Sequence, residues 1–335
     1  MKTDIFVRVA LLLIGLTALP LAAADRAPDR QSALPVNASY PERPVRFIVP
    51  FPPGGSDTVA RMIGQKLGEK FGQQFVIDNR AGAGGTLGAA IAAKAPADGY
   101  TILFATASFA ISASLYRDLP YDSIRDFTAV GLVSSGPMLV VVHPSLPVAS
   151  IRDLIAYARA KPDALNFAST GAGTITHLAA ELFKSMTGVR LTHVPYKGSG
   201  PAQTDLLGGQ VQLMFDVIGA ALPHARAGKV KALAVTSAMR SALVPDIPTV
   251  AESGVADYDA STWYGVLAPR GTPRRIVSRL NNQIVATLGS AEFRERLGAL
   301  GFEPQITTPE QFADALRTDI AKWARTIKDA GIGVN

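Results

Sequence analysis

Val45-Arg-Phe-Ile-Val-Pro-Phe-Pro-Pro-Gly-Gly-Ser-Asp-Thr-Val-Ala-Arg61 joins an apolar strand, a glycine turn and the start of a helix, and so indicates the type of fold. The β-branched and aromatic residues of Val45–Val49 favour a strand, and the prolines and glycines that follow force a turn. Ser56 is expected to cap the helix, and Gly72 is expected to end it in a left-handed conformation. Apolar side chains recur at helical spacing between these ends, at Ala60, Ile63, Leu67 and Phe71.

A second copy of this arrangement is Leu165-Asn-Phe-Ala-Ser-Thr-Gly-Ala-Gly-Thr-Ile-Thr-His177, with Thr174 as the natural cap and Gly188 at the helix end. The N-terminus of a helix leaves backbone N–H groups unpaired and carries about half a positive charge. Glycine turns in front of it let a carboxylate or phosphate approach closely. Such turns also reverse the chain in most α/β domains, so one copy alone would be interpreted as structural. The pair predicts a cleft in which two helix ends bind an anion.

Strand and helix patterns alternate along the rest of the chain, which predicts an α/β fold with largely parallel sheets. The expected strands are Val45–Val49, Phe75–Asp78, Thr101–Ala105, Leu139–His143, Leu165–Ala168, Val211–Phe215 and Lys231–Val235. Three helices are expected in the C-terminal third, after Pro273, after Ser290 and after a capping box at Thr308–Gln311. These helices are expected to pack on a sheet and not to contact a ligand.

Two β-rich segments, residues 127–144 and 230–236, resemble strands that cross between two domains. Residues 40–136 and 237–335 are therefore expected to form domain 1 together, and residues 137–236 to form domain 2. Two crossings make a hinge. The expected architecture is a two-domain α/β protein that closes on a ligand in the cleft between its domains.

The first 24 residues have the pattern of a secretory signal peptide. Lys2 and Arg8 precede an apolar run, and Ala22-Ala-Ala24 offers small residues for cleavage before Asp25. Residues 25–39, rich in proline, serine and charge, are interpreted as a flexible leader. Cleavage lowers the formal net charge from +6 to about +5, and the mature chain is expected to be an exported, periplasmic protein.

Several classes of function are disfavoured by composition and motifs. The chain has no cysteine, which excludes disulfides, thiolate metal sites and cysteine catalysis. No basic stretch with interleaved aromatic residues is visible, so no nucleic-acid partner is expected. The motifs GxSxG, SxxK and HExxH are absent, as are the dinucleotide fingerprint and the phosphate loop. Neither an enzyme nor a cofactor is therefore expected.

Histidines offer the only formal alternative of a metal site. His177 and Glu181 stand four residues apart on one helix and could share a metal ion, but no third ligand is visible. We therefore expect a surface pair and no metal. His143 and His193 lie in strand-like segments and are interpreted as ordinary buried or edge histidines.

Two further glycine turns precede helices, at residues 81–86 and 196–201, and either could line the cleft. Trp263 and Tyr264 follow another turn. They could form a wall over the ligand, but packing in the core against the C-terminal helices is the favoured interpretation.

Five motifs occur along the chain in a recognisable order. They are Pro50-Phe-Pro-Pro-Gly-Gly-Ser-Asp-Thr-Val-Ala-Arg61, Asp78-Asn-Arg-Ala-Gly-Ala-Gly-Gly-Thr86, Ala97-Asp-Gly-Tyr100, Val194-Pro-Tyr-Lys-Gly-Ser199 and Asp205-Leu-Leu-Gly-Gly-Gln-Val211. Together they resemble the Bug (TctC-like) family, and the resemblance extends from Tyr40 to the C-terminus.

This resemblance implies a periplasmic solute receptor with a Venus-flytrap, type II-like fold and no enzymatic activity. It implies a small carboxylated solute, a tripartite tricarboxylate transporter in the membrane as partner, and a chain that acts as a monomer. Dicarboxylates, aromatic acids and acidic amino acids all remain open as solutes. Two alternatives also remain: a ligand sensor for a membrane-bound signalling system and, less favoured, a secreted hydrolase.

In that family, backbone amides and ordered waters at turns of both domains meet the ligand carboxylate, which implies binding by Phe51–Asp57 and Ser169–Thr174. Asp216, just after the expected strand Val211–Phe215, either receives an ammonium or hydroxyl group of the ligand or caps the following turn. The full set of expected ligand-binding residues is Phe51, Pro53, Gly54, Gly55, Ser56, Asp57, Thr106, Ser108, Ser169, Thr170, Gly171, Ala172, Gly173, Thr174, Tyr196, Lys197 and Asp216.

Overall fold

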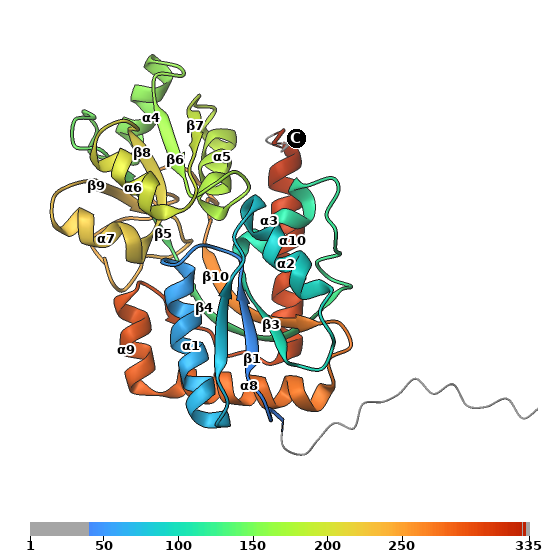
Figure 1. Ribbon diagram of the computed structural model, residues 1–335. Coiled ribbons are helices and arrows are strands. Elements are labelled where there is room, and N and C mark those ends of the chain that lie inside the picture. Colours follow the sequence, from blue (N-terminus) through green and yellow to red (C-terminus); the bar gives the residue numbers. More distant parts are fainter. Residues whose placement is uncertain (1–39, 330, 333–335) are drawn as a thin grey trace, which may run out of the picture. The chain divides into compact units, whose positions relative to one another are not determined.

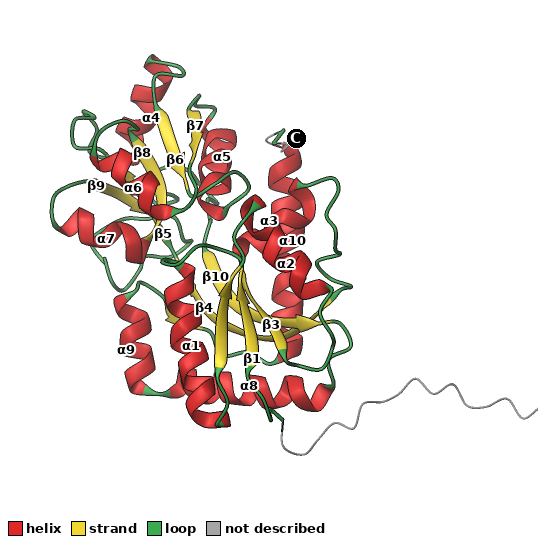
Figure 2. Ribbon diagram, viewed as in Figure 1, coloured by secondary structure: helices red, strands yellow, loops and turns green. Residues whose placement is uncertain are grey.

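The computed structural model describes residues 40–329 and 331–332. The predicted signal peptide, residues 1–24, and the predicted leader, residues 25–39, lie outside the described residues. The described part contains two β-sheets, each covered by helices on both faces (Figure 1, Figure 2). Within this part, no helix is both long and apolar enough to cross a membrane.

The first sheet combines strands from both ends of the chain. Among the described residues its order is β11 (Glu303–Pro304), β4 (Phe127–Gly136), β10 (Thr262–Pro269), β3 (Thr101–Thr106), β1 (Val45–Val49) and β2 (Phe75–Asn79). Strand β1 pairs in parallel with β2 and with β3. Strand β10 is antiparallel to β3 and β4, and β11 is antiparallel to β4.

Side chains alternate along the first sheet and so supply two hydrophobic layers. Phe47 and Val49 face one layer of helices, whereas Ile48, between them, faces the other. The first layer holds α1 (Ser56–Phe71), α8 (Arg274–Gly289) and α9 (Ala291–Ala299). The second holds α2 (Thr86–Ala93), which follows a short 3-10 helix at Ala83–Gly85, together with α3 (Ala107–Leu115) and α10 (Pro309–Asp329). Figure 1 shows the two sets on opposite sides of the sheet.

The second sheet is built from the middle of the chain. Its order is β7 (Thr192–Pro195), β6 (Asn166–Ser169), β8 (Leu213–Val217), β5 (Met138–Val142) and β9 (Lys231–Val235). Strand β6 pairs in parallel with β7 and β8, whereas β5 is antiparallel to β8 and β9. Helices α4 (Ile151–Ala160) and α5 (Ile175–Thr187) cover one face, and α6 (Ser199–Leu207) and α7 (Ile218–Arg226) cover the other.

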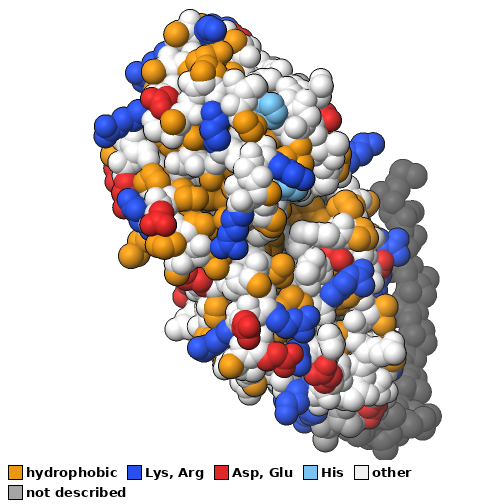
Figure 3. Space-filling model, turned by 90° about the vertical axis from the view of Figure 1, so that its left-hand side faces the viewer, with side chains coloured by type: hydrophobic (Ala, Val, Ile, Leu, Met, Phe, Trp, Pro, Cys, Tyr) orange, Lys and Arg blue, Asp and Glu red, His pale blue; other side chains and the backbone are white. Residues whose placement is uncertain are grey.

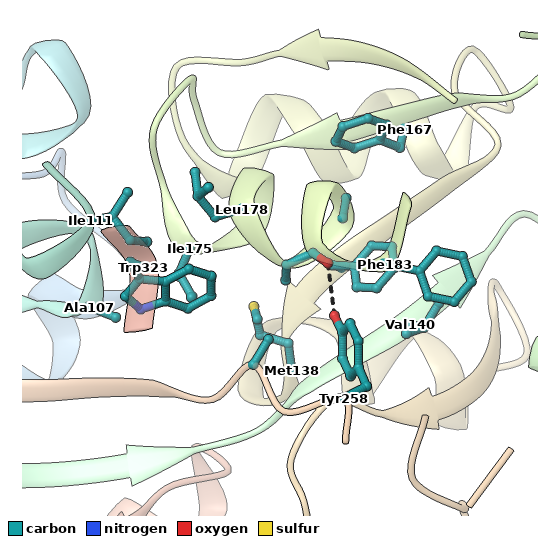
Figure 4. Packing of buried hydrophobic residues seen from close by; sticks show 14 of the residues in the cluster. Ala107, Ile111, Met138, Val140, Phe167, Ile175, Leu178, Phe183, Tyr258 and Trp323 are labelled. Carbon is teal, nitrogen blue, oxygen red and sulfur yellow. Dashed lines mark hydrogen bonds between the residues drawn. The ribbon is translucent and has the colours of Figure 1, made fainter. Parts of the chain in front are cut away.

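One hydrophobic cluster continues from the helices of the first sheet to those of the second (Figure 4). The side chain of Trp323 on α10 is fully buried in this cluster, as are Leu178 and Phe183 on α5. The hydroxyl of Tyr258 donates a 2.9 Å hydrogen bond to the carbonyl of Ala179 on α5. The segment that leads back to the first sheet is thereby fixed to a helix of the second.

The prediction of largely parallel sheets is wrong, because both sheets are mixed. In the first sheet β10 runs against its neighbours, and in the second β5 does so. Parallel neighbours need a crossover connection, usually a helix on the same sheet. Strand β5 instead follows β4 directly through Pro137, and β10 returns from the other sheet. Strands β5 and β10 are therefore antiparallel to their neighbours.

The helix ends follow the sequence signals with one exception. Gly72 and Gly188 adopt the predicted left-handed conformation, and Ser290 accepts a hydrogen bond from the Phe293 amide. Thr308 and Gln311 bond each other's backbone amides, which confirms the capping box. The predicted cap Ser56 is wrong: α1 is capped by Gly55, because the helix already begins at Ser56.

The strands of the first sheet fall in residues 45–136 and 262–304, and those of the second in residues 138–235. The chain passes from one sheet to the other twice, at Pro137 and between β9 and β10. The predicted domains, residues 40–136 with 237–335 and residues 137–236, have boundaries between these sets of strands. They stay a prediction.

Candidate functional site

A cavity of about 510 Å³ is lined by residues from both sheets. Its walls come from the loop between β1 and α1, the start of α3, the loop between β6 and α5, the start of α6, the end of β8 and the start of α7. Strand β10 and the link that follows α9 complete it through Tyr264, Leu300 and Phe302. In Figure 3, hydrophobic side chains lie in a hollow between the upper and lower parts of the face shown.

The loop between β1 and α1 lines the cavity with Phe51–Ser56. Gly54 and Gly55 have φ angles of 103° and 52°, which residues with a side chain rarely adopt. The turn that they form leads into α1 at the cavity. Within the described residues, the backbone N–H groups of Gly55 and Ser56 make no hydrogen bond. Two donors at the positive end of α1 are thus left for another partner.

Asp57 holds this loop from behind and does not line the cavity. Its carboxylate is buried, accepts a 2.8 Å hydrogen bond from Arg61 and accepts a 2.9 Å hydrogen bond from the amide of Asn79. The Asn79 amide also donates to the carbonyl of Phe51, at 2.9 Å. Asp57 therefore fixes the loop through Asn79.

The loop between β6 and α5 forms a second wall with Thr170, Thr174 and the first residues of α5. The hydroxyls of Thr170, Thr174 and Thr176 lie 2.9–3.1 Å from one another. Thr174 is the cap residue, as predicted, but its hydroxyl donates to the Gly171 carbonyl instead of accepting from the helix. The backbone N–H groups of Ile175 and Thr176 make no hydrogen bond within the described residues.

Two histidines support this second loop from the side away from the cavity. His193 on β7 lies 2.6 Å from the Ser169 hydroxyl, which accepts a hydrogen bond from the Gly171 amide. His177 on α5 accepts a 3.2 Å hydrogen bond from the Gly173 amide at Nδ1. Burial, and next the nearby His177, lower the pKa of His193 to about 3.

The expected surface pair of His177 and Glu181 is wrong, because both side chains are largely buried. Helix α5 turns this face inward, so that His177 stacks on His193. Nε2 of His177 lies 3.7 Å from the Glu181 carboxylate, which also pairs with Lys184 at 2.7 Å. Among residues 40–329 and 331–332, no group of three or more acidic and histidine side chains could hold a metal ion.

Asp216 at the end of β8 is the buried carboxyl group of the cavity wall, with an exposed fraction of 1%. Its Oδ2 accepts a 2.7 Å hydrogen bond from Gln203 on α6, and its Oδ1 accepts a 2.9 Å hydrogen bond from the Val217 amide. Burial raises the pKa of Asp216 to about 6, against the lowering effect of these hydrogen bonds. The Val217 contact means that Asp216 does hold the following turn, while it still faces the cavity.

Eleven of the expected ligand-binding residues line the cavity and six do not. Those that line it are Phe51, Pro53, Gly54, Gly55, Ser56, Thr106, Ser108, Thr170, Thr174, Lys197 and Asp216. Those that do not are Asp57, Ser169, Gly171, Ala172, Gly173 and Tyr196. The Tyr196 hydroxyl instead donates to Asp205 on α6, at 2.7 Å. Contact of any of these residues with a ligand stays a prediction.

Several lining residues lie outside the expected set of ligand-binding residues. They include Ser199, Gln203, Gly219, Thr262, Tyr264, Leu300 and Phe302. The glycine turn at residues 196–201 was a signal for the first two. Core packing was the favoured interpretation for both Trp263 and Tyr264. Trp263 does pack on α10, where its Nε1 donates to Asp319, but Tyr264 on the same strand lines the cavity.

Comparison with known proteins gives consistent matches over most of the chain. The family model described as "Tripartite tricarboxylate transporter family receptor" matches residues 59–332. Protein BugT of Bordetella pertussis is 42% identical over 303 residues, which cover 89% of this chain and 93% of BugT. The structure of R. palustris Rpa4515 with adipate has a TM-score of 0.84 and 43% identity, covering 88% of this chain and 99% of that one. MatC from Rhodopseudomonas palustris with bound malate has a TM-score of 0.81 and 35% identity, covering 86% and 100%.

Proposed function

The chain belongs to the tripartite tricarboxylate transporter receptor family, and on that premise we propose that it captures a small carboxylated solute in the cavity between its two sheets. Like its relatives, it is a solute-binding receptor and not an enzyme. Rpa4515 was solved with adipate and MatC with malate, both small carboxylates. These two relatives support a carboxylate as the solute here.

The observation that carries the proposal is the pair of helix starts at the cavity. Gly55 and Ser56 at α1, and Ile175 and Thr176 at α5, are lining residues of the cavity, and their four backbone N–H groups make no hydrogen bond within the described residues. Each helix also contributes the positive end of its dipole. A carboxylate has enough lone pairs to accept from both sets of amides. The first N–H groups of every α-helix lack an intrahelical partner, and at these two helices they belong to residues of the cavity, where an anion can accept hydrogen bonds from them.

The proposed roles differ between the lining residues and those behind them. The expected ligand-binding residues that line the cavity contact the solute directly or through water. Asp57 holds the first loop, and Ser169, with Gly171–Gly173, shapes the second. Tyr196 holds α6 through Asp205, near the end of that helix.

We further propose export to the periplasm by residues 1–24, action as a monomer, and delivery of the solute to a tripartite tricarboxylate transporter. The family description supports the transporter partner. The structures of a periplasmic transporter and of the periplasmic binding protein BugD, 37% and 38% identical to this chain, support the compartment.

A thermal-shift screen of residues 25–335 tests the proposed function. The probes are carboxylates and, for each, the uncharged amide of the same skeleton. A ligand that binds only the folded state raises the melting temperature, so carboxylates are expected to raise it and their amides are not. Equal shifts with acids and amides, or shifts with neither, would exclude the helix-end site.

A further inference from the structure

A carboxyl group of the protein lines the cavity, in addition to the two helix starts that are proposed to bind the carboxylate of the solute. Asp216 lines the wall and is 1% exposed, yet no lysine, arginine or histidine of the described residues forms an ion pair with it. Lys197 lines the same cavity but is exposed to solvent. A buried carboxylate without a counter-charge is unfavourable unless other groups stabilise it.

The protein stabilises this carboxylate with neutral donors alone. The amides of Gln203 and Val217 each donate one hydrogen bond to it. The Ser199 hydroxyl also lowers the pKa of Asp216, although no hydrogen bond of ordinary geometry joins the two groups. Each carboxylate oxygen can accept about two hydrogen bonds, so both retain capacity for another donor.

Tyr264 is a buried titratable residue of the same cavity. Burial, and next the charge of Asp216, raise the pKa of Tyr264. Tyr264 and Asp216 both line the cavity, on strands of different sheets. The neutral phenol carries no charge that could balance the carboxylate.

We propose that Asp216 determines the specificity of the cavity by accepting a hydrogen bond from an ammonium group of the solute, so that the solute is a carboxylate that also carries an amine. This inference rests on the proposed function, because the helix ends hold the carboxylate of the same solute. An ammonium supplies both the missing donor and the missing positive charge. A dicarboxylate whose second group reached Asp216 would add a like charge instead.

Probes that differ in only one group test separately how the carboxylate and the ammonium group of the solute are bound. Adipate, 6-aminohexanoate and hexanoate share one chain length and differ in a single end group, and malate and aspartate differ in a hydroxyl against an ammonium. Isothermal titration of the purified protein at pH 7.5 is expected to show at least one amine-bearing probe binding tenfold or more tightly than its amine-free counterparts. The variant Asp216→Asn is expected to remove this preference, because it should weaken binding of the amine-bearing probes more than binding of the amine-free carboxylates.

Asp118→Asn is the matched control, because Asp118 is exposed and does not line the cavity. It should bind all probes like the unmodified protein. If carboxylates bind without any preference for the amine, the assignment of Asp216 is overturned and the proposed function stands. If Asp216→Asn weakens all probes equally, the specificity role is also overturned. If no carboxylate binds at all, the proposed function itself fails and the inference falls with it.

Discussion

The imidazole rings of His177 and His193 stack with their centroids 3.9 Å apart, and each ring supports the loop between β6 and α5. The ring of Phe167 lies beside both imidazoles, with its centroid 4.8 Å from that of His193 and 6.2 Å from that of His177. Nδ1 of His177 accepts a hydrogen bond from the Gly173 amide and so carries no proton. Two imidazolium ions at this separation would repel each other, so the stack disfavours a proton on His193.

This stack predicts that the protein loses stability in acid. The pKa of His193 is lowered to about 3 in the folded state, against 6.5 in a free side chain. The unfolded state therefore binds a proton first, and the stability present above pH 6.5 is lost as the pH falls towards 3. Melting temperatures between pH 7.5 and pH 4 measure the loss.

His193→Gln should show a smaller change of melting temperature over the same pH range, since glutamine does not titrate. His224→Gln on α7 is the control and should keep the full change. The same pH slope in the unmodified protein and in His193→Gln would show that the stack does not control acid stability.

The raised pKa of Asp216 predicts that stability falls as the pH rises, which is opposite to the trend predicted for His193. Its pKa is raised to about 6, so the unfolded state ionises first and stability is lost as the pH rises from about 4 to about 6. Asp216→Asn removes this titration and should raise the free energy of unfolding of the ligand-free protein at pH 7.5 by about 1–3 kcal/mol. Urea unfolding at pH 7.5 and at pH 4 measures the difference, which should shrink at the lower pH. A variant that is equally destabilised at both pH values would contradict this.

Gly219 predicts the effect of adding a single methyl group between the sheets. Gly219 at the start of α7 lines the cavity, and a Cβ there would lie 1.9 Å from the carbonyl oxygen of Leu300. The methyl forces α7 and the segment after α9 apart, so Gly219→Ala should weaken carboxylate binding at least tenfold by calorimetry. Gly298→Ala, on α9 with no atom within 4 Å of the added methyl, is the control and should bind normally. Normal binding by Gly219→Ala would show that this contact is not needed for the bound state.

Thr170 predicts the effect of filling the cavity at the second helix start. Thr170→Leu places an apolar branch beside the unpaired amides of α5 and removes one of three linked hydroxyls. Binding of carboxylates should fall at least a hundredfold, with the circular dichroism spectrum unchanged. Thr170→Ser should retain most of the affinity, and Thr318→Leu, on the exposed side of α10, should retain all of it. Unchanged affinity in Thr170→Leu would place the carboxylate elsewhere.

Local signals predicted the elements that position the cavity. The prolines and glycines after Val49, and those around Gly171, act within a few residues, so both strand–turn–helix units could be inferred from the sequence. The capping box at Thr308 and Gln311 is local in the same way. The cap of α1 was misplaced by one residue because serine and glycine are both good caps, and only the backbone conformation decides between them.

The remaining walls depend on contacts between distant parts of the chain. Tyr264 faces the cavity because of its register against Ser134 and Thr106, which no local pattern specifies. Leu300 and Phe302 reach it because α9 ends against α7. The burial of His177 likewise depends on the docking of α5 against β7, so the helical pattern alone suggested a surface position.

The cavity wall begins at Phe51 and is completed only at Phe302. These residues lie near opposite ends of the described chain, so a partly folded chain in which Leu300 and Phe302 have not yet packed has no complete cavity. A solute cannot assist the early steps of folding, because the pocket that would hold it does not yet exist. A bound solute therefore stabilises only the folded state, which lowers the population of unfolded chains that proteases can attack.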